Sequence, residues 1–226
     1  MKILIKYPSR QRPEIFKQRM KEYQELLSGE HEVIFLISCD EDDATMNNAK
    51  IKKFIKAYDN TQVFFNKQPQ TKISAINANI NEVKEWDIIL VISDDMLPKV
   101  QGFDKIIADK FTELYPNGNG VIWLNDGYRG KNSQYPLCTI PLMGRFYYDR
   151  FGYVYHPEYI SLWADNEFHD VARKFGRMTY VHEVIIEHIL PSNVKETEYD
   201  ELYQRNDKFF YSDKDIYNRH KLNRFQ

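Results

Sequence analysis

Two adjacent carboxylates, Asp94 and Asp95, follow the most apolar stretch of the chain, the aliphatic run 88–92. Such a run is typical of a strand buried on both faces, and Pro98 prevents the strand from continuing. Open α/β sheets bind ligands at the carboxyl ends of their strands, and paired acids there can hold a divalent cation against a phosphate. The alternative is a turn in which Asp is simply common.

Further polar residues stand at the ends of other expected strands. Pro8-Ser9-Arg10 follows a strand over 2–7, and the acidic run 40–43 follows a strand over 33–38. Glu187-His188 ends an expected strand over 179–186. Because the carboxyl ends of parallel strands meet at one edge, these residues are candidates for the same site.

The elements that must position these residues alternate along the chain. Helices are expected at 13–27, at 45–57 and from Thr71, where Ile73, Ile76, Ile80 and Val83 form an apolar stripe. A strand is expected at 62–66. Strand and helix thus alternate four times within the first 96 residues, which predicts an α/β fold with a mostly parallel central sheet and right-handed crossovers.

The second half of the chain is expected to complete the same domain. Helices are predicted near 103–115 and 164–175, with strands at 121–124 and 136–143, and an irregular aromatic segment at 153–159. The tail from Lys195 is polar and aromatic, and it is expected to form one or two helices. We expect one domain over 1–192, with a helical extension over 193–226 packed on it.

Composition excludes several classes of protein. The chain has 226 residues and a formal net charge of −2, which argues against a nucleic-acid binder that works through a basic surface. Cys39 and Cys138 have no metal-ligand spacing and fit a reducing compartment. No apolar run reaches the roughly 20 residues of a membrane span, and no signal peptide opens the chain. We therefore expect a cytoplasmic protein, and the sequence does not determine its oligomeric state.

Taken in order, these motifs resemble those of a nucleotide-sugar glycosyltransferase of the GT-A fold, similar to the inverting family 2 type. The motifs that carry the resemblance are Pro8-Ser9-Arg10, the acids after the second strand, Lys72 and Asn77 on one helix, Ser93-Asp94-Asp95, the segment 163–168 and His188. The resemblance covers nearly the whole chain up to about Ser192. It implies a three-layer, Rossmann-like sandwich.

The resemblance also implies a metal site. Asp95 would be a ligand of Mn²⁺ or Mg²⁺, and Asp94 would contact the ribose, or the metal through water. The ion would stabilise the negative charge of the leaving nucleoside diphosphate. The motif departs from the family's DXD pattern because Ser93 replaces the first acid, which puts metal affinity in doubt. His188 would be a further ligand; the alternative is a half-buried histidine satisfied by the backbone.

Asp165 is the candidate general base. An inverting transfer needs a carboxylate to take the proton of the acceptor hydroxyl, and the family places that acid at the start of a helix. Asp165 shares a helix face with Phe168 and Ala172, although an acid is favoured at a helix N-terminus in any case. Glu167 is the second choice. Asp126, in an Asn-Asp-Gly turn, could contact sugar hydroxyls or serve only the turn.

The nucleotide is expected to lie against the first half of the chain. Backbone groups at Pro8 and Ser9 would frame the base, and Arg10 would reach phosphate. Asp40 would accept from the base or ribose, with Asp42 as an alternative that the sequence does not separate. Lys72 would contact base or phosphates, although an exposed lysine is the commoner outcome.

These features predict a metal-dependent glycosyltransferase that moves a sugar from a nucleotide-sugar donor to a hydroxyl acceptor, and inversion is the expected outcome. The acceptor is not identified: a glycan, a lipid-linked molecule, a protein and a nucleic-acid-linked group all remain open. One alternative is a nucleotidyltransferase, which would usually show a Gly-rich loop after the first strand. The other is a non-catalytic nucleotide-sugar binder of the same fold.

Overall fold

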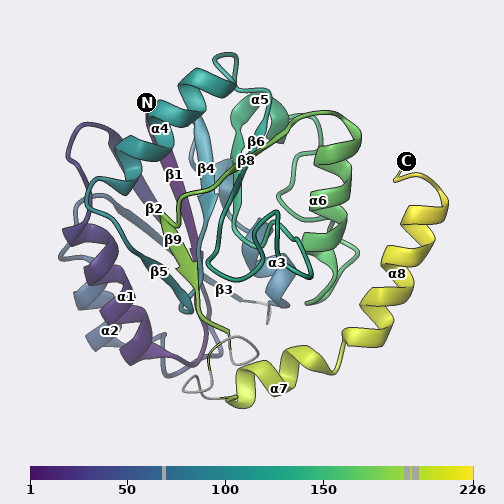
Figure 1. The fold of residues 1–226 in the computed structure, drawn as a ribbon. Helices are drawn as coiled ribbons and strands as arrows, with labels where there is room; N and C mark the ends of the chain where they lie inside the picture. Colours follow the sequence, from purple (N-terminus) through teal and green to yellow (C-terminus); the bar gives the residue numbers. More distant parts are fainter. Residues whose placement is uncertain (68–69, 191–193, 195–198, 226) are drawn as a thin grey trace.

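A seven-stranded sheet between two layers of helices forms the body of the molecule (Figure 1). The computed structural model describes all residues except 68–69, 191–193, 195–198 and 226. The strands of this sheet, in spatial order, are β3 (Thr61–Asn66), β2 (Glu32–Asp40), β1 (Lys2–Pro8), β4 (Ile88–Val91), β7 (Pro141–Gly144), β6 (Val121–Leu124) and β8 (Met178–Val181). A separate two-stranded sheet joins β5 (Met96–Pro98) to β9 (Ile186–His188).

The large sheet is parallel except at one strand. β1 pairs in parallel with β2 and β4, β2 with β3, and β6 with β8. β7 runs antiparallel to both of its neighbours, β4 and β6. The predicted α/β fold with a mostly parallel central sheet is therefore confirmed.

Helices cover both faces because successive strand residues point to opposite sides. On β1, Ile3 and Ile5 belong to one core, and Leu4 belongs to the other. The first core packs against α1 (Pro13–Glu25), α2 (Ala49–Ile55) and α4 (Phe103–Leu114). The second packs against α3 (Lys72–Asn77), α5 (Arg145–Tyr148), α6 (Ala164–Lys174) and α8 (Phe210–Leu222). The predicted three-layer sandwich is confirmed.

The helix expected from Thr71 is shorter than its apolar stripe. Thr71 caps α3 as predicted, since its side chain accepts a hydrogen bond from the backbone N–H of Ser74. Helix α3 nevertheless ends at Asn77, and Asn79 adopts a left-handed backbone with φ of 64° before the 3₁₀ turn η1 (Ile80–Glu82). Ile80 and Val83 remain buried, so burial rather than a continuous helix produced the stripe.

Two strand predictions in the second half were wrong in extent. Of the expected strand over 136–143, only residues 141–143 are in a strand, β7, which continues to Gly144. The expected strand over 179–186 is two strands, β8 and β9, which belong to different sheets. The connection is only residues 182–185, and its Val184 and Ile185 lead directly into β9, so the sequence pattern does not reveal that the chain leaves one sheet for another.

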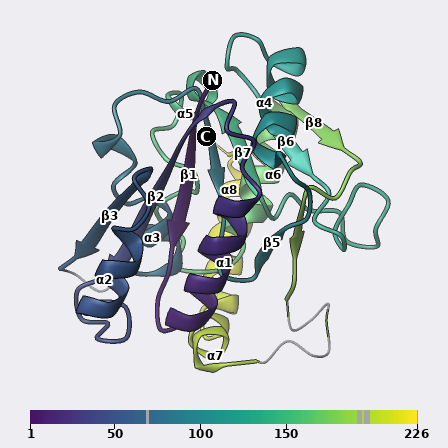
Figure 2. The same cartoon turned by 90° about the vertical axis from the view of Figure 1, so that its left-hand side faces the viewer.

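The predicted helical tail is present as α7 (Glu201–Asp207) and α8. In Figure 2, α7 lies beyond the carboxyl end of β1. The predicted division between residues 192 and 193 falls outside the described residues. Among the described residues, no helix combines the length and the apolar character needed to cross a bilayer.

A lysine is buried within the sheet. Lys6, on β1, is fully buried, and its Nζ donates hydrogen bonds to Ser38 Oγ and, at 2.8 Å, to the carbonyl oxygen of Ala78. Burial disfavours the charged ammonium and lowers the pKa of Lys6 from 10.5 to about 7.

This buried amine predicts a pH-dependent stability. Between about pH 7 and 10.5 the unfolded chain binds a proton that the folded chain does not, so the free energy of unfolding rises with pH, by up to about 1.4 kcal/mol per unit. We expect Lys6→Met to remove that rise, measured by urea unfolding between pH 7 and 9. The exposed Lys53→Met is the matched control and should keep it. An unchanged slope in Lys6→Met would contradict the assignment.

Candidate functional site

A cavity of about 1300 Å³ opens where β1, β2 and β4 end. It is lined by the loop after β1, by Asp40 at the end of β2 and by the segment 93–95 that follows β4. Residues of α7 and the N-terminal end of α6 complete its wall. The predicted meeting of strand ends therefore produces a hollow large enough for a sizeable ligand.

Asp95 and His188 lie side by side in this cavity because β5 and β9 pair antiparallel. The ladder sets Met96 opposite His188, and the N–H of Ile189 donates to the carbonyl oxygen of Asp95 at 2.8 Å. Nε2 of His188 is 3.5 Å from Oδ1 of Asp95, and both side chains are largely buried. The two predicted metal ligands, which are 93 residues apart in sequence (188 − 95), are thus brought together.

The donor set at this point fits a divalent cation. Each ligand of a shared ion lies about 2.1 Å from it, so two ligand atoms 3.5 Å apart can hold one ion. A carboxylate and an imidazole are an ordinary ligand pair for ions such as Mn²⁺. Nδ1 of His188 is buried and has no hydrogen-bond partner among the described residues.

Contacts with His188, Ser93 and Tyr203 keep Asp95 ionised. Burial acts to raise the pKa of Asp95, but His188, Ser93 and Tyr203 outweigh burial and hold it well below its usual range. Ser93 Oγ donates to Oδ1, and the hydroxyl of Tyr203 donates to Oδ2 at 2.7 Å. The serine that replaces the first acid of the motif therefore orients Asp95.

Asp94 points into the protein rather than into open space. It is buried, and it accepts hydrogen bonds from the Tyr7 hydroxyl at 2.7 Å and from Ser9 Oγ at 3.1 and 3.2 Å. Burial raises its pKa to about 7. Asp94 contributes to the cavity lining, yet both of its oxygens brace the end of β4 against the end of β1.

The nucleotide-side residues form an ion-pair cluster. Arg10 donates to Asp40 and, at 2.8 Å, to Asp42, while Oδ1 of Asp40 accepts from the N–H of Gln70 at 3.1 Å. Asp40 lines the cavity and is buried, whereas Asp42 is exposed and lies outside the lining formed by the described residues. This contrast favours Asp40 over Asp42. Pro8, Ser9 and the exposed Lys72 also line the cavity.

Asp165 presents a carboxylate with few competing partners to the same cavity. It lies in the first turn of α6 and lines the cavity. Its carboxylate accepts a hydrogen bond from the N–H of the adjacent Asn166 at 3.0 Å and accepts no other from the described residues. Trp163, at the N-cap, has a left-handed backbone with φ of 63°. Non-glycine residues in that region store strain, which is commonly found at functional sites.

Two predicted site residues lie outside the cavity lining formed by the described residues. Glu167 is buried and accepts from the Tyr159 hydroxyl at 2.6 Å, with His220 Nδ1 at 2.7 Å. Asp126 accepts from the N–H groups of Tyr128 and Arg129 and from Thr139 Oγ1. Their carboxylates hold local structure, which leaves Asp165 as the base candidate and gives Asp126 the turn role already considered.

Helix α7 supplies site residues that the sequence did not identify. The guanidinium of Arg12 pairs with Asp200 at 2.7 and 2.9 Å and lies 4.5 Å from the centre of the Tyr203 ring. Asp200 also caps α7 by accepting from the N–H of Tyr203 at 3.0 Å. An Asp just before the apolar residues of a helix, as Asp200 is before Leu202 and Tyr203, is an N-cap signal, but it does not reveal what the helix covers.

No protein-family model matches the chain, and no curated protein matches it in sequence. Solved structures do share its fold. One is the mannosyltransferase PcManGT from Pyrobaculum calidifontis in complex with GDP-Man and Mn²⁺, with a TM-score of 0.64 and 9% identity over 83% of this chain and 57% of that one. Another is S. aureus TarS 1-349 in complex with UDP-GlcNAc, with a TM-score of 0.61 and 14% identity over 90% and 61%.

These matches show the fold. At 9% and 14% identity the likeness extends to the arrangement of helices and strands, and the predicted GT-A-like architecture is confirmed. The chain spans less than two thirds of the length of either protein.

The contact between Tyr203 and Asp95 predicts how α7 is held. We expect Tyr203→Phe to lose a hydrogen bond to a charged group, worth about 1.5–3 kcal/mol, while keeping the ring beneath Arg12. Amide hydrogen exchange in α7 should then become about 10- to 100-fold faster. Tyr148→Phe, which removes a hydroxyl bonded to the carbonyl oxygen of Gly152 rather than to α7, is the control and should leave exchange in α7 unchanged. Equal exchange in Tyr203→Phe and the unmodified protein would show that this bond does not hold α7.

Proposed function

We propose that this protein is a glycosyltransferase that moves a sugar from a nucleoside-diphosphate sugar to a hydroxyl acceptor, with the help of a divalent cation. The observation that carries the proposal is the meeting of Asp95 with His188 in a cavity that Asp165 also lines. Two proteins of the same fold support it, since their structures hold GDP-Man with Mn²⁺ and UDP-GlcNAc. The catalytic domain would span 1–192, with 193–226 as a helical extension.

The donor's nucleotide would lie against the ends of β1 and β2. Asp40 is the candidate acceptor for base or ribose donors, and its bond to Arg10 fixes its orientation. Pro8 and Ser9 would frame the nucleotide, with Lys72 at the rim of the cavity. Asp94 would act mainly through Ser9, whose hydroxyl it holds.

The diphosphate would lie near Asp95 and His188. A bound Mn²⁺ or Mg²⁺ supplies positive charge that stabilises the leaving nucleoside diphosphate. Asp95 offers an ionised carboxylate there, held in place by Ser93 and Tyr203. These two hydroxyls keep the Asp95 carboxylate oriented, and the burial of the site strengthens the attraction between this carboxylate and a cation.

Asp165 would act as the general base. It would accept the proton of the acceptor hydroxyl as that oxygen attacks the anomeric carbon from the face opposite the leaving group, which gives inversion. Its carboxylate accepts only the local bond from Asn166 among the described residues, so an oxygen remains available for this proton.

The acceptor would enter past aromatic side chains. Tyr135 and Tyr211 line the cavity and are largely exposed, with 68% and 78% of their surface accessible. The flat faces of these exposed rings suit contact with a ring-shaped acceptor.

Donor binding can be tested by thermal unfolding with GDP-Man and UDP-GlcNAc as the first probes in a wider set of nucleotide sugars. Ligand at 100 times its Kd should stabilise the folded chain by about 2.7 kcal/mol, and Mn²⁺ should increase the effect of a given concentration. Asp95→Asn should lose the Mn²⁺-dependent part. A melting temperature unmoved by every nucleotide sugar, with and without Mn²⁺, would contradict the proposal.

Catalysis is tested separately from binding by Asp165→Asn. Its amide keeps an oxygen for the N–H of Asn166 but is not a base, so transfer should fall by about 100- to 10,000-fold while donor affinity stays unchanged. Asp170→Asn, the same change on α6 at a residue outside the described cavity lining, is the matched control and should retain transfer. Donor binding by the unmodified chain with no transfer to any acceptor would favour the non-catalytic binder, and unchanged transfer in Asp165→Asn would rule out Asp165 as the base.

A further inference from the structure

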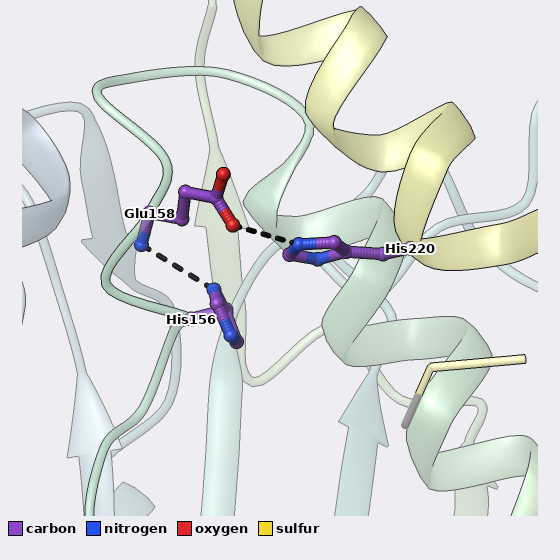
Figure 3. Close-up of side chains that lie close together, drawn as sticks. All are labelled: His156, Glu158 and His220. Atoms are coloured by element: carbon purple, nitrogen blue, oxygen red, sulfur yellow. Dashed lines mark hydrogen bonds and ion pairs between the residues drawn. The ribbon is translucent and has the colours of Figure 1, made fainter. Parts of the chain in front are cut away.

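A second group of metal-ligating side chains lies outside the cavity lining formed by the described residues. His156 and Glu158 come from the segment between α5 and α6, and His220 comes from α8. One possible ligand atom from each lies within 4.8 Å of the others. Figure 3 shows the three side chains turned toward one space between that segment and α8.

His220 lies between two carboxylates. Its Nδ1 is 2.7 Å from Glu167 Oε2, and its Nε2 is 2.9 Å from Glu158 Oε2. A neutral imidazole has one N–H and can donate to only one of them. The other contact brings a nitrogen lone pair against a carboxylate oxygen, so it requires an additional cation, which is either a proton or a metal ion.

His156 adds a third possible ligand beside this pair. A proton on His220 would satisfy both carboxylates, whereas a metal ion would also use a ring nitrogen of His156. The His156 ring lies 4.6 Å from the His220 ring, centre to centre, and its Nδ1 accepts a long hydrogen bond from the N–H of Glu158 at 3.3 Å, which a metal ion bound at Nδ1 would replace. Arg219 pairs with the other oxygen of Glu158, which leaves Oε2 for the shared space.

Glu167 is positioned to orient the His220 ring as a metal ligand. Histidines that bind metal usually donate their second ring N–H to a carboxylate, which fixes the tautomer and makes the ring a better ligand. Glu167 is buried, is oriented by the Tyr159 hydroxyl and receives His220 Nδ1. This arrangement directs His220 Nε2 toward Glu158 and His156.

We propose that His156, Glu158 and His220 bind one divalent ion of the Zn²⁺ class, with water in the remaining position. Two imidazoles and one carboxylate are a ligand set that Zn²⁺ uses in proteins, and imidazole favours Zn²⁺ over Mg²⁺. The site is separate from Asp95 and His188, and it does not depend on the proposed glycosyltransferase activity.

An ion here would fasten α8 to the chain segment that leads to Asp165. Asp213, on α8, accepts hydrogen bonds from the N–H groups of Ile160, Ser161 and Leu162, at 3.2, 2.8 and 2.7 Å. Asp213 is fully buried. The ion would therefore add a second fastening between α8 and the same segment, and its role would be structural.

The test is isothermal titration of the chelator-treated full chain with Zn²⁺ alone. We expect Glu167→Gln, which removes a carboxylate that orients a ligand, to weaken Zn²⁺ binding by about 10- to 100-fold. His156→Gln and His220→Gln remove ligands and should each weaken Zn²⁺ binding by more than that. His182→Gln is the matched control, and Asp95→Asn removes the candidate ligand in the cavity. Both should retain one Zn²⁺ bound at these three residues. Circular dichroism verifies that each variant is folded.

The location of the ion gives a second measurement that needs no variant. Crystals grown with Zn²⁺ should show an anomalous peak about 2.0–2.1 Å from ring nitrogens of His156 and His220. Absence of Zn²⁺ binding would overturn the proposal. So would binding that persists in both His156→Gln and His220→Gln, or that is lost in Asp95→Asn while His156→Gln retains it.

Discussion

The short ladder between β5 and β9 is the constraint on which the candidate site depends. Each strand has three residues, yet their pairing sets Met96 opposite His188 and brings Asp95 to 3.5 Å from the imidazole. Because β5 follows β4 closely, this ladder also fixes the distant β9 beside the carboxyl ends of the large sheet. The charge chemistry proposed for the cavity therefore rests on a few backbone hydrogen bonds between segments far apart in sequence.

Around that point, specific hydrogen-bond partners hold the buried carboxylates at the strand ends. Asp94 is held by Tyr7 and Ser9, and Asp40 by Arg10. Buried carboxylates are costly without such partners, so these bonds set which oxygens remain available. Asp165 differs from them, since its carboxylate accepts only a local bond from the described residues. That difference is the physical reason for giving it the reactive role.

The sequence predicted the fold well because its signals are periodic and long. Alternating strands and helices identified the parallel sheet, and the run 88–92 located Asp94 and Asp95. It did not predict β5 or the separation of β9 from β8, since strands of three residues carry no periodicity. It also did not predict the contact of Tyr203 with Asp95 across 108 residues. Asp165 and Glu167 share one helical turn, so only side-chain contacts separate them, and the roles of both remain predictions.

The long sequence separations have a consequence for the order of folding. Arg12 meets Asp200 across 188 residues, and these contacts complete the wall of the cavity. On a ribosome the chain emerges from its N-terminus, so β1 to β4 are available to pair well before Asp200 and Tyr203 exist. The sheet and its carboxylates are thus synthesised first, and the pocket acquires its final shape only when α7 docks, a late step in biogenesis governed by non-local contacts.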